Sequence, residues 1–281
     1  MTLFRVFVVV SFAFALGVSA TLGSAAPQRI VSINACTDQL LFRLADRERI
    51  AALSVYAADP TLSIDADKVR ASGVPLISGS AEEVLKLKPD LVLAGLWTRR
   101  ATRDRLKAEG LRLEEFAPPN TLDAVKVGIR RIADLLGETK RGDAMLRDLE
   151  EAERSASSAS RGLTALQFQR RGYTSGEGTL IGDLLHVVGL GNAAIELGIR
   201  SVGPAPLESV LKTRADLLIL LDAAPSASDQ GTALLYHPAL LAAYPPEHWI
   251  IVPANLTVCG GPAIATALER LSEAIRRLPP R

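Results

Sequence analysis

Short runs of β-branched and apolar residues alternate with segments of helical spacing along most of this chain. The first run covers residues 29–33, and Leu40, Leu41 and Leu44 follow it at the spacing of one helix face. The same alternation predicts further strands at 49–55, 74–77, 90–94 and from 110, with helices at 81–87 and 99–109. Strands separated by helices form parallel sheets with helical crossovers, so the sequence predicts an α/β fold.

A long helical segment separates this region from a second one of the same kind. Leu122, Val125 and Ile129 keep helical spacing, and the charged run 138–154 extends the segment past Gly137, where we expect a kink or break. The α/β pattern then resumes at 163–168. The expected organisation is an N-terminal lobe over 26–119, a single long bridging helix over 120–160 and a C-terminal lobe over 161–281.

One segment of the chain is repeated. Residues 82–93 match residues 208–219 at six of twelve positions, and each copy has the pattern of a helix that runs into a buried strand. Packing in any such unit explains the matched Val and Leu residues. It does not explain the matched acidic residues, Glu82 with Glu208 and Asp90 with Asp216. One Glu at an equivalent point on each lobe predicts two surfaces related by a pseudo-twofold axis, which would suit a twofold partner.

The first 25 residues have the features of a secretory signal peptide. Arg5 precedes an apolar run at 6–18, and small residues follow it up to Ala26. The run is shorter than the roughly 20 residues that span a bilayer, which disfavours the alternative of a retained membrane anchor. No Cys lies near the cleavage zone, so no lipid can be attached there. We expect a cleaved, non-lipidated protein of the bacterial periplasm.

Charge and composition disfavour several functions. The net charge is +1, from 32 basic and 31 acidic residues without a run of like charges, so nucleic-acid binding is not expected. The three His residues do not lie at metal-ligand spacing from one another, and we expect no metal site built by the protein itself. No Gly-x-Ser-x-Gly turn, P-loop or paired His motif occurs, and this leaves a secreted α/β enzyme only as an alternative.

Several segments, in their order along the chain, resemble the periplasmic binding proteins of ABC importers for iron chelates, haem and cobalamin. These segments are 29–44, 87–93, 173–176 with 184–192, and 208–216. The resemblance implies two Rossmann-like lobes with a ligand cleft between them and limited closure. It also implies a monomer that captures a ferric siderophore, haem or cobalamin and delivers it to the membrane permease, with no cofactor and no catalytic residue. A ligand sensor on the same fold is the alternative.

The resemblance also implies roles for Glu82 and Glu208. In the family, an acidic residue at the matching position of each lobe pairs with arginines of the membrane-spanning subunits. Two separated carboxylates can fix an orientation, although each exposed pair contributes only about 0 to 1 kcal/mol. Glu83, in contrast, follows Ser80 at the spacing of a capping box, and we expect it to be structural.

Aromatic residues in loops next to strands are the first candidates for ligand contact, because large planar chelates bind to aromatic faces and a few polar groups. Tyr56 and Trp97 follow predicted strands of the first lobe, and Tyr173 precedes Thr174 and Gly176 in the second. The alternatives are a simple surface tyrosine for Tyr56 and packing on the next helix for Trp97.

Two turns into helices complete the candidate ligand site. One contains Asn34, Cys36 and Thr37, and the other contains Cys259 and runs to 262. Both match family segments at the cleft, and helix N-terminal amides there could hold carboxylates or phosphates, ordinary turns being the alternative.

The two cysteines, Cys36 and Cys259, leave three alternatives open: a disulfide, contact with the ligand or its metal, and unpaired small residues. Two Cys alone fall short of zinc coordination, and no His lies nearby to complete a site.

Overall fold

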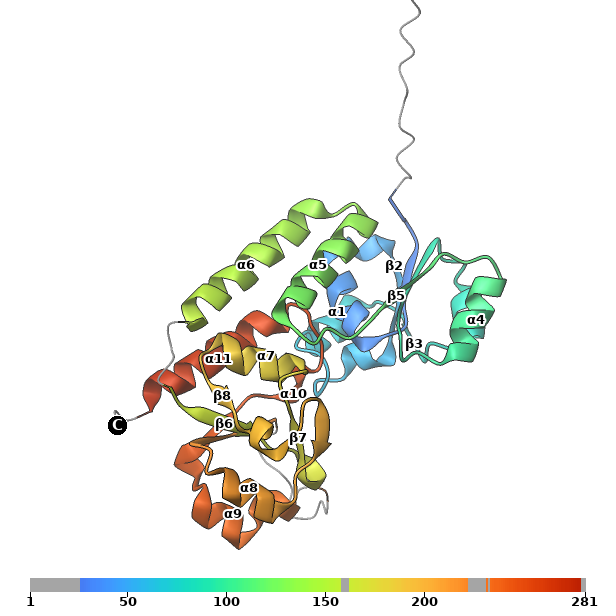
Figure 1. Cartoon of the computed structure of the whole chain (residues 1–281). Helices are drawn as coiled ribbons and strands as arrows, with labels where there is room; N and C mark the ends of the chain where they lie inside the picture. The colour runs from blue at the N-terminus through green and yellow to red at the C-terminus, as the bar shows by residue number, and fades with distance from the viewer. Residues whose placement is uncertain (1–25, 158–161, 222–230, 232, 279–281) are drawn as a thin grey trace, which may run out of the picture.

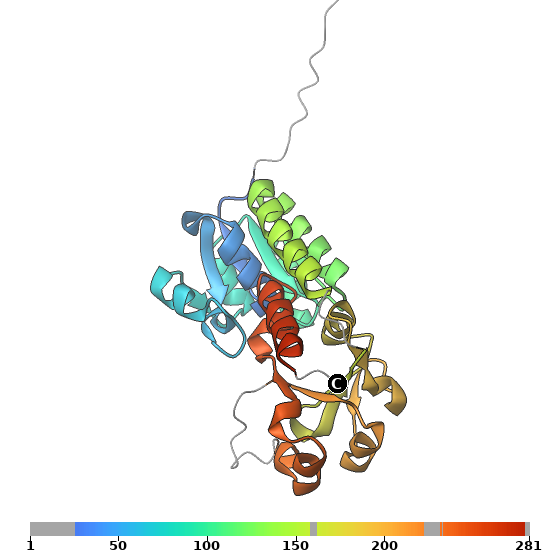
Figure 2. The same ribbon diagram turned by 90° about the vertical axis from the view of Figure 1, so that its left-hand side faces the viewer.

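The chain folds into two α/β lobes that lie on either side of a group of helices (Figures 1 and 2). A computed structural model describes residues 26–157, 162–221, 231 and 233–278. The expected signal peptide, residues 1–25, and the end of the expected bridging segment, residues 158–160, lie outside the described residues. No helix in the described ranges is both long and apolar enough to cross a membrane.

The first lobe is built on a parallel five-stranded sheet of order β3-β2-β1-β4-β5. Its strands are β1 (Ile30–Ser32), β2 (Ile50–Ser54), β3 (Leu76–Ile77), β4 (Leu91–Gly95) and β5 (Leu113–Phe116). The connecting helices are α1 (Ala35–Leu44), η1 (Arg47–Arg49), η2 (Val55–Ala58), α2 (Ala66–Ser72), α3 (Ala81–Lys86) and α4 (Arg100–Ala108). The alternation predicted from the sequence is confirmed, because each strand returns to the same sheet through a helical or looped crossover.

The second lobe repeats this plan with a parallel four-stranded sheet of order β11-β10-β6-β8 and a separate antiparallel pair, β7-β9. Its strands are β6 (Thr164–Gln167), β7 (Tyr173–Ser175), β8 (Gly191–Asn192), β9 (Val202–Pro204), β10 (Leu217–Leu220) and β11 (Trp249–Ile251). Its helices are η3 (Arg170–Gly172), α7 (Leu180–Val187), η4 (Ala193–Leu197), α8 (Leu207–Thr213), η5 (Ala233–Tyr236), α9 (Pro238–Ala243), η6 (Pro246–His248), α10 (Ala254–Thr257) and α11 (Ala263–Arg277). The sequence pattern did not reveal the antiparallel pair.

The expected single helix between the lobes is two helices, α5 (Leu122–Leu136) and α6 (Thr139–Ser157). Gly137 ends α5 with φ 72°, a left-handed conformation, and the amide of Glu138 donates to Ala133 O at 2.8 Å. The two helices lie side by side in both views, and a Cβ at Gly142 would collide with the side chain of Ala133. The long helix that leads into the second lobe is therefore α6, and the break at Gly137 returns the chain along α5.

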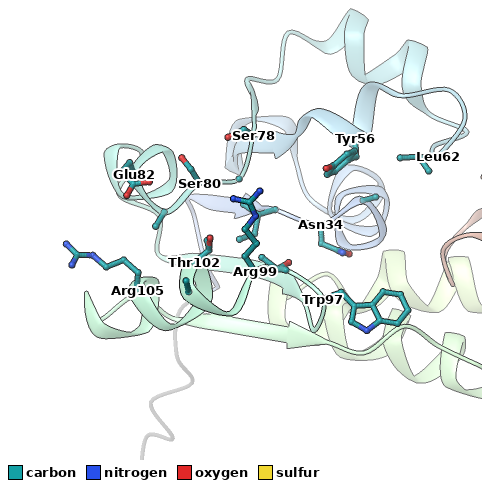
Figure 3. Close-up of a pocket in the computed structure, with 16 residues that line it drawn as sticks. Asn34, Tyr56, Leu62, Ser78, Ser80, Glu82, Trp97, Arg99, Thr102 and Arg105 are labelled. Atoms are coloured by element: carbon teal, nitrogen blue, oxygen red, sulfur yellow. The ribbon is translucent and has the colours of Figure 1, made fainter.

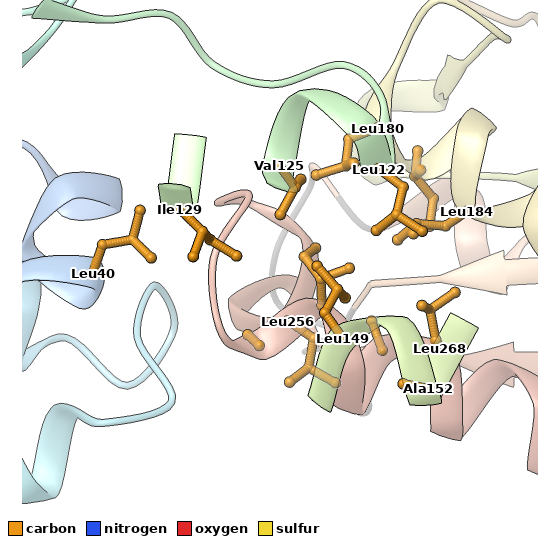
Figure 4. Close-up of a cluster of buried hydrophobic side chains, with 14 of the residues drawn as sticks. Leu40, Leu122, Val125, Ile129, Leu149, Ala152, Leu180, Leu184, Leu256 and Leu268 are labelled. Carbon is orange, nitrogen blue, oxygen red and sulfur yellow. The ribbon is translucent and has the colours of Figure 1, made fainter. Parts of the chain in front are cut away.

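A continuous hydrophobic core joins the two lobes. It extends from Ile30 and Leu91 of the first sheet to Ala165 and Leu217 of the second. Between the sheets the core is filled by side chains of several helices, seen in Figure 4: Leu40 of α1, Val125 and Ile129 of α5, Leu149 of α6, Leu184 of α7 and Leu268 of α11. Because this core is shared, a large rotation of one lobe against the other would expose it, and we expect little movement of that kind.

The internal repeat corresponds to two equivalent units, α3 with β4 and α8 with β10. Lys88 and Arg214 occupy the same position in the two copies, and both have positive φ, 46° and 48°. The matched aspartates make equivalent hydrogen bonds. Asp90 accepts hydrogen bonds from the amides of Gln28 and Arg29 before β1, and Asp216 accepts one from the amide of Thr164 at the start of β6. The repeated Asp therefore anchors a neighbouring strand, which the sequence alone did not explain.

Candidate ligand-binding site

A pocket of about 680 Å³ lies in the first lobe at the carboxyl ends of β1 to β4. Loops that follow parallel strands meet at this edge of a sheet, which is where ligands of open α/β sheets bind. The labelled residues around it in Figure 3 are Asn34, Tyr56, Leu62, Ser78, Ser80, Glu82, Trp97, Arg99, Thr102 and Arg105. The structure thus brings Asn34, Tyr56 and Trp97 together, as expected from the sequence, and adds Glu82, which we had placed at a permease contact.

Two aromatic side chains face this pocket without being part of the core. Tyr56 is 51% exposed and Trp97 is 84% exposed. The loop around Trp97 is held by its backbone, since the amide of Thr98 donates to Gly95 O at 3.0 Å and the amide of Gly95 donates to Thr98 Oγ1 at 3.2 Å. An exposed indole on an ordered turn is suited to stacking on a ligand, because burying its apolar face against the ligand is favourable.

Asn34 has a structural role and a free donor. Its Oδ1 caps α1 by accepting the amides of Cys36 at 3.0 Å and Thr37 at 3.3 Å. Its Nδ2 lies 2.5 Å from the position that a Cβ of residue 95 would take, so Gly95 is required for this arrangement. Within the described residues Nδ2 donates no hydrogen bond, which leaves it available to a ligand in the pocket.

A buried carboxyl lies beneath the same loops. Asp38 of α1 is completely buried, its Oδ1 accepts the amide of Ser54 at 3.3 Å, and its other oxygen bonds the Ser54 hydroxyl. Ser54 ends β2, two residues before Tyr56, so Asp38 ties the helix that carries Asn34 to the strand that carries the tyrosine. Burial raises the pKa of Asp38 to about 7, against the lowering effect of hydrogen bonds from Ser32 and Ser54.

This pKa predicts how stability depends on pH. Between its ordinary pKa and about 7, Asp38 keeps a proton in the folded chain that it loses on unfolding, so stability falls as pH rises through this window. From pH 5 to pH 7.5 we expect the free energy of unfolding to fall by about 2 to 3 kcal/mol from this group. Asp38→Asn keeps the shape without the charge and should remove that fall in urea titrations. An identical pH dependence in both proteins would contradict the prediction.

Three predicted ligand contacts are corrected by their burial. Thr37 is 2% exposed and its hydroxyl lies 2.8 Å from Ser32 Oγ. Thr174 is fully buried and its hydroxyl donates to Gln167 O at 2.6 Å. Gly176 is buried, and a Cβ there would collide with Ile199 O, so this glycine serves close backbone packing. The hydroxyls of Thr37 and Thr174 thus bond to the protein itself.

Tyr173 lies on the second lobe and does not line the pocket. It opens β7, is 41% exposed and pairs with Pro204 of β9. A role for Tyr173 in ligand contact therefore remains a proposal that depends on a ligand large enough to reach both lobes.

Cys36 and Cys259 form a disulfide, with Cα atoms 5.0 Å apart although 223 positions separate them in sequence. This selects one of the three alternatives and corrects the assignment of the two residues as ligand-contacting thiols. The cysteines meet because α10 and the turn that follows it contact the first lobe, where Asn255 Nδ2 of α10 donates to Pro60 O at 2.9 Å. Gly260 follows and packs against Pro119 and Val125 so closely that no Cβ fits.

The pocket also contains residues that sequence reasoning missed. Arg99, Thr102 and Arg105 come from the loop before α4 and from α4 itself, and Leu62 comes from the loop after η2. A charged amphipathic helix is usually a solvated surface, so nothing in its pattern distinguished these positions. Among the described residues, no group of three or more His, Cys, Asp or Glu side chains is arranged to hold a metal ion.

Comparison with known proteins agrees with this architecture. The chain is 24% identical over 258 residues to a protein of Halobacterium salinarum named cobalamin-binding protein, covering 88% of this chain and 69% of that one. It is 22% identical over 270 residues to an ABC transporter substrate-binding lipoprotein of Bacillus subtilis, covering 89% and 80%.

Solved structures show the same two-lobed fold. The periplasmic haem-binding protein of Roseiflexus sp. RS-1 superposes with a TM-score of 0.70 at 25% identity, covering 88% of this chain and 97% of the other. The periplasmic vitamin B12-binding protein of Vibrio cholerae gives 0.67 at 14% identity, covering 89% and 97%. The family described as periplasmic binding protein matches residues 30–253. On this match, the chain belongs to the periplasmic binding protein family.

Proposed function

We propose that this protein is the substrate-binding component of an ABC importer, and that it captures a metal chelate and delivers it to a membrane permease. The observation that carries the proposal is the pocket at the strand ends, where Trp97 and Tyr56 present exposed aromatic faces. A ferric siderophore, haem or cobalamin fits such a site because the chelate supplies its own metal ligands and a large surface to cover. The relatives are named as binding proteins for ligands of this kind and as part of ABC transport, which supports binding over catalysis.

The shared core supports the same function. The pocket is lined by residues of the first lobe alone, which packs into a core shared with the second lobe, so the pocket is present before a ligand arrives. A preformed site loses less conformational entropy on binding, which favours capture of a scarce ligand.

The proposed compartment is the periplasm, with residues 1–25 removed, no lipid attached and the mature chain a monomer. Mass spectrometry of the exported protein gives its first residue and any lipid, and light scattering gives its oligomeric state. The Bacillus subtilis relative is named a lipoprotein, so the mass measurement also shows whether this protein is free or anchored by a lipid.

Binding is tested first by thermal stabilisation of residues 26–281 with haem, ferric siderophores, cobalamin, cobinamide, zinc and manganese. A ligand that binds only the folded chain adds about 2.7 kcal/mol at one hundred times its dissociation constant. For a chain of this size we therefore expect the melting temperature to rise by about 5 to 10 °C with one chelate. A rise with zinc or manganese alone, or with none of the compounds, would count against capture of a chelate.

We also propose that Glu82 and Glu208 contact the permease. Both are exposed in the first turn of equivalent helices, α3 and α8. Within the described residues neither carboxylate makes a hydrogen bond or ion pair, whereas the matched Asp90 and Asp216 anchor strands. The neighbouring Glu83 is also engaged, since it accepts the amide of Ser80 at 3.2 Å in a capping box. The fold thus leaves these two repeated acids without a structural role.

The double variant Glu82→Ala with Glu208→Ala is expected to reduce uptake in cells about tenfold or more, because two orienting ion pairs with the permease are lost. Because Glu82 also lines the pocket, ligand affinity in solution is compared in the single variant Glu208→Ala, where it should not change. Asp143→Ala with Glu247→Ala is the matched control, since it removes two other exposed carboxylates. Unchanged uptake in the first variant, with binding intact, would contradict the docking role.

A further inference from the structure

We propose that the pocket selects a negatively charged chelate, and that Arg99 binds an anionic oxygen of that ligand while Trp97 and Tyr56 cover its flat apolar surface. This inference rests on the proposed function and narrows its substrate class. It assigns a binding role to a residue that follows β4 and precedes α4.

Arg99 differs from the other cations of its segment. Each of those has a carboxylate partner: Arg100 with Asp104 at 3.4 Å, Arg103 with Glu115 at 2.6 Å, Arg105 with Glu109 at 2.6 Å and Lys107 with Glu115 at 3.2 Å. Among the described residues Arg99 has no ion pair and no side-chain hydrogen bond. Its guanidinium nevertheless lines the pocket, so its positive charge is available to a ligand.

The charges of the pocket are separated along its length. Figure 3 shows the Arg99 guanidinium between Ser80 and Asn34, with Trp97 beyond Asn34 on one side. Glu82 lies on the other side, near Arg105. The aromatic residue Trp97 and the carboxylate of Glu82 therefore lie on opposite sides of the Arg99 guanidinium in this view. An anionic edge placed at Arg99 meets no acidic group of the pocket lining there.

Neighbouring groups define the shape of the ligand. Asn34, whose Nδ2 donates no hydrogen bond within the described residues, lines the same pocket as Arg99 and offers a second donor to a ligand. The indole of Trp97 and the ring of Tyr56 offer planar faces, and such faces match a flat conjugated ligand. A planar metal chelate with carboxylate groups on one edge fits both features, because a guanidinium binds a carboxylate through two parallel hydrogen bonds.

Iron protoporphyrin IX and its dimethyl ester are suitable probes, since they share the plane and differ in the two carboxylates. We expect the wild-type protein to bind the acid at least tenfold more tightly than the ester. Arg99→Gln should weaken binding of the acid by about 10- to 100-fold and change binding of the ester less than about twofold. Raising the salt concentration should weaken the acid complex of the wild type more than that of the variant.

Arg100→Gln is the matched control, because Arg100 is adjacent, exposed and already paired with Asp104; it should leave both affinities unchanged. Circular dichroism and melting of each variant report folding independently of binding. Equal affinity for acid and ester in the wild type would overturn the inference, as would equal losses for both in Arg99→Gln. In either case a porphyrin still binds and the proposed function stands. If cobalamin or a neutral ferric hydroxamate binds and the acid does not, the inference fails alone; if no chelate binds, the proposed function fails with it.

Discussion

Removing the disulfide through Cys36→Ala with Cys259→Ala is expected to lower the free energy of unfolding by about 3 to 5 kcal/mol. The bond closes a loop with a sequence separation of 223 residues, and a crosslink over so long a loop greatly restricts the unfolded chain. Cys259 is also buried, at 1% exposure, so a reductant in solution has little access to its sulfur while the chain is folded. Urea unfolding of the double variant and of the wild type with and without reductant measures the effect.

Two further comparisons show whether the loss of stability comes from the missing crosslink. The dependence of unfolding free energy on urea should increase in the double variant, because an unfolded chain without the crosslink exposes more surface. The reduced wild type should resemble the double variant, apart from small changes from the substituted side chains. Equal stability of all three proteins would show that contacts such as Asn255 with Pro60 O and the shared core hold the segment in place without the bond.

Ile129→Ala is expected to lower the free energy of unfolding by about 3 to 4 kcal/mol, because it opens a cavity in a core that cannot fully collapse. Ile129 is completely buried on α5, next to Leu40 of the first lobe and Val125 in Figure 4. Since the same cluster continues into the second lobe, the variant should destabilise both lobes together. Val127→Ala is the control on the same helix, because Val127 is 62% exposed and should change stability by less than about 0.5 kcal/mol.

Hydrogen exchange separates the two lobes in this test. Amides of β4 report on the first sheet and amides of β10 on the second. We expect the slowest exchange in both strands to accelerate by similar factors in Ile129→Ala. Acceleration confined to β4 would mean that the lobes unfold independently and that the continuous core does not couple them.

Together these two predictions describe how the pocket is kept in shape. The disulfide fixes Cys36 directly beside Asn34, and the shared core fixes α1 against α5. A loss of either should loosen Asn34 before it affects Trp97, whose turn is held by local hydrogen bonds of Gly95 and Thr98.

Much of the fold follows from patterns that depend only on local chemistry. β-branched runs and helical spacing predict the alternating strands and helices, and the repeated segment predicts equivalent units in the two lobes. The capping box at Ser80 and Glu83 is present because its hydrogen bonds are made within one turn. The positions of Tyr56 and Trp97 after strands placed them at one edge of the sheet, where they line the same pocket, since parallel strands end together.

Other features depend on contacts between residues far apart in sequence. A Thr in a short strand has the same local pattern whether its hydroxyl meets solvent or Gln167 O, so the burial of Thr174 in β7 was not predictable. Likewise, Arg99 resembles its basic neighbours until their carboxylate partners are located.

The sequence by itself therefore determined the α/β class, the two lobes and the repeated Glu and Asp positions, because these depend on residue type and spacing. Only the tertiary structure decided that the connecting helix turns back at Gly137, that Cys36 meets Cys259, and that Arg99 alone among the cations of its segment lacks a carboxylate partner within the described residues. Pairing of this kind is decided by which surfaces pack together, and packing is a property of the whole chain.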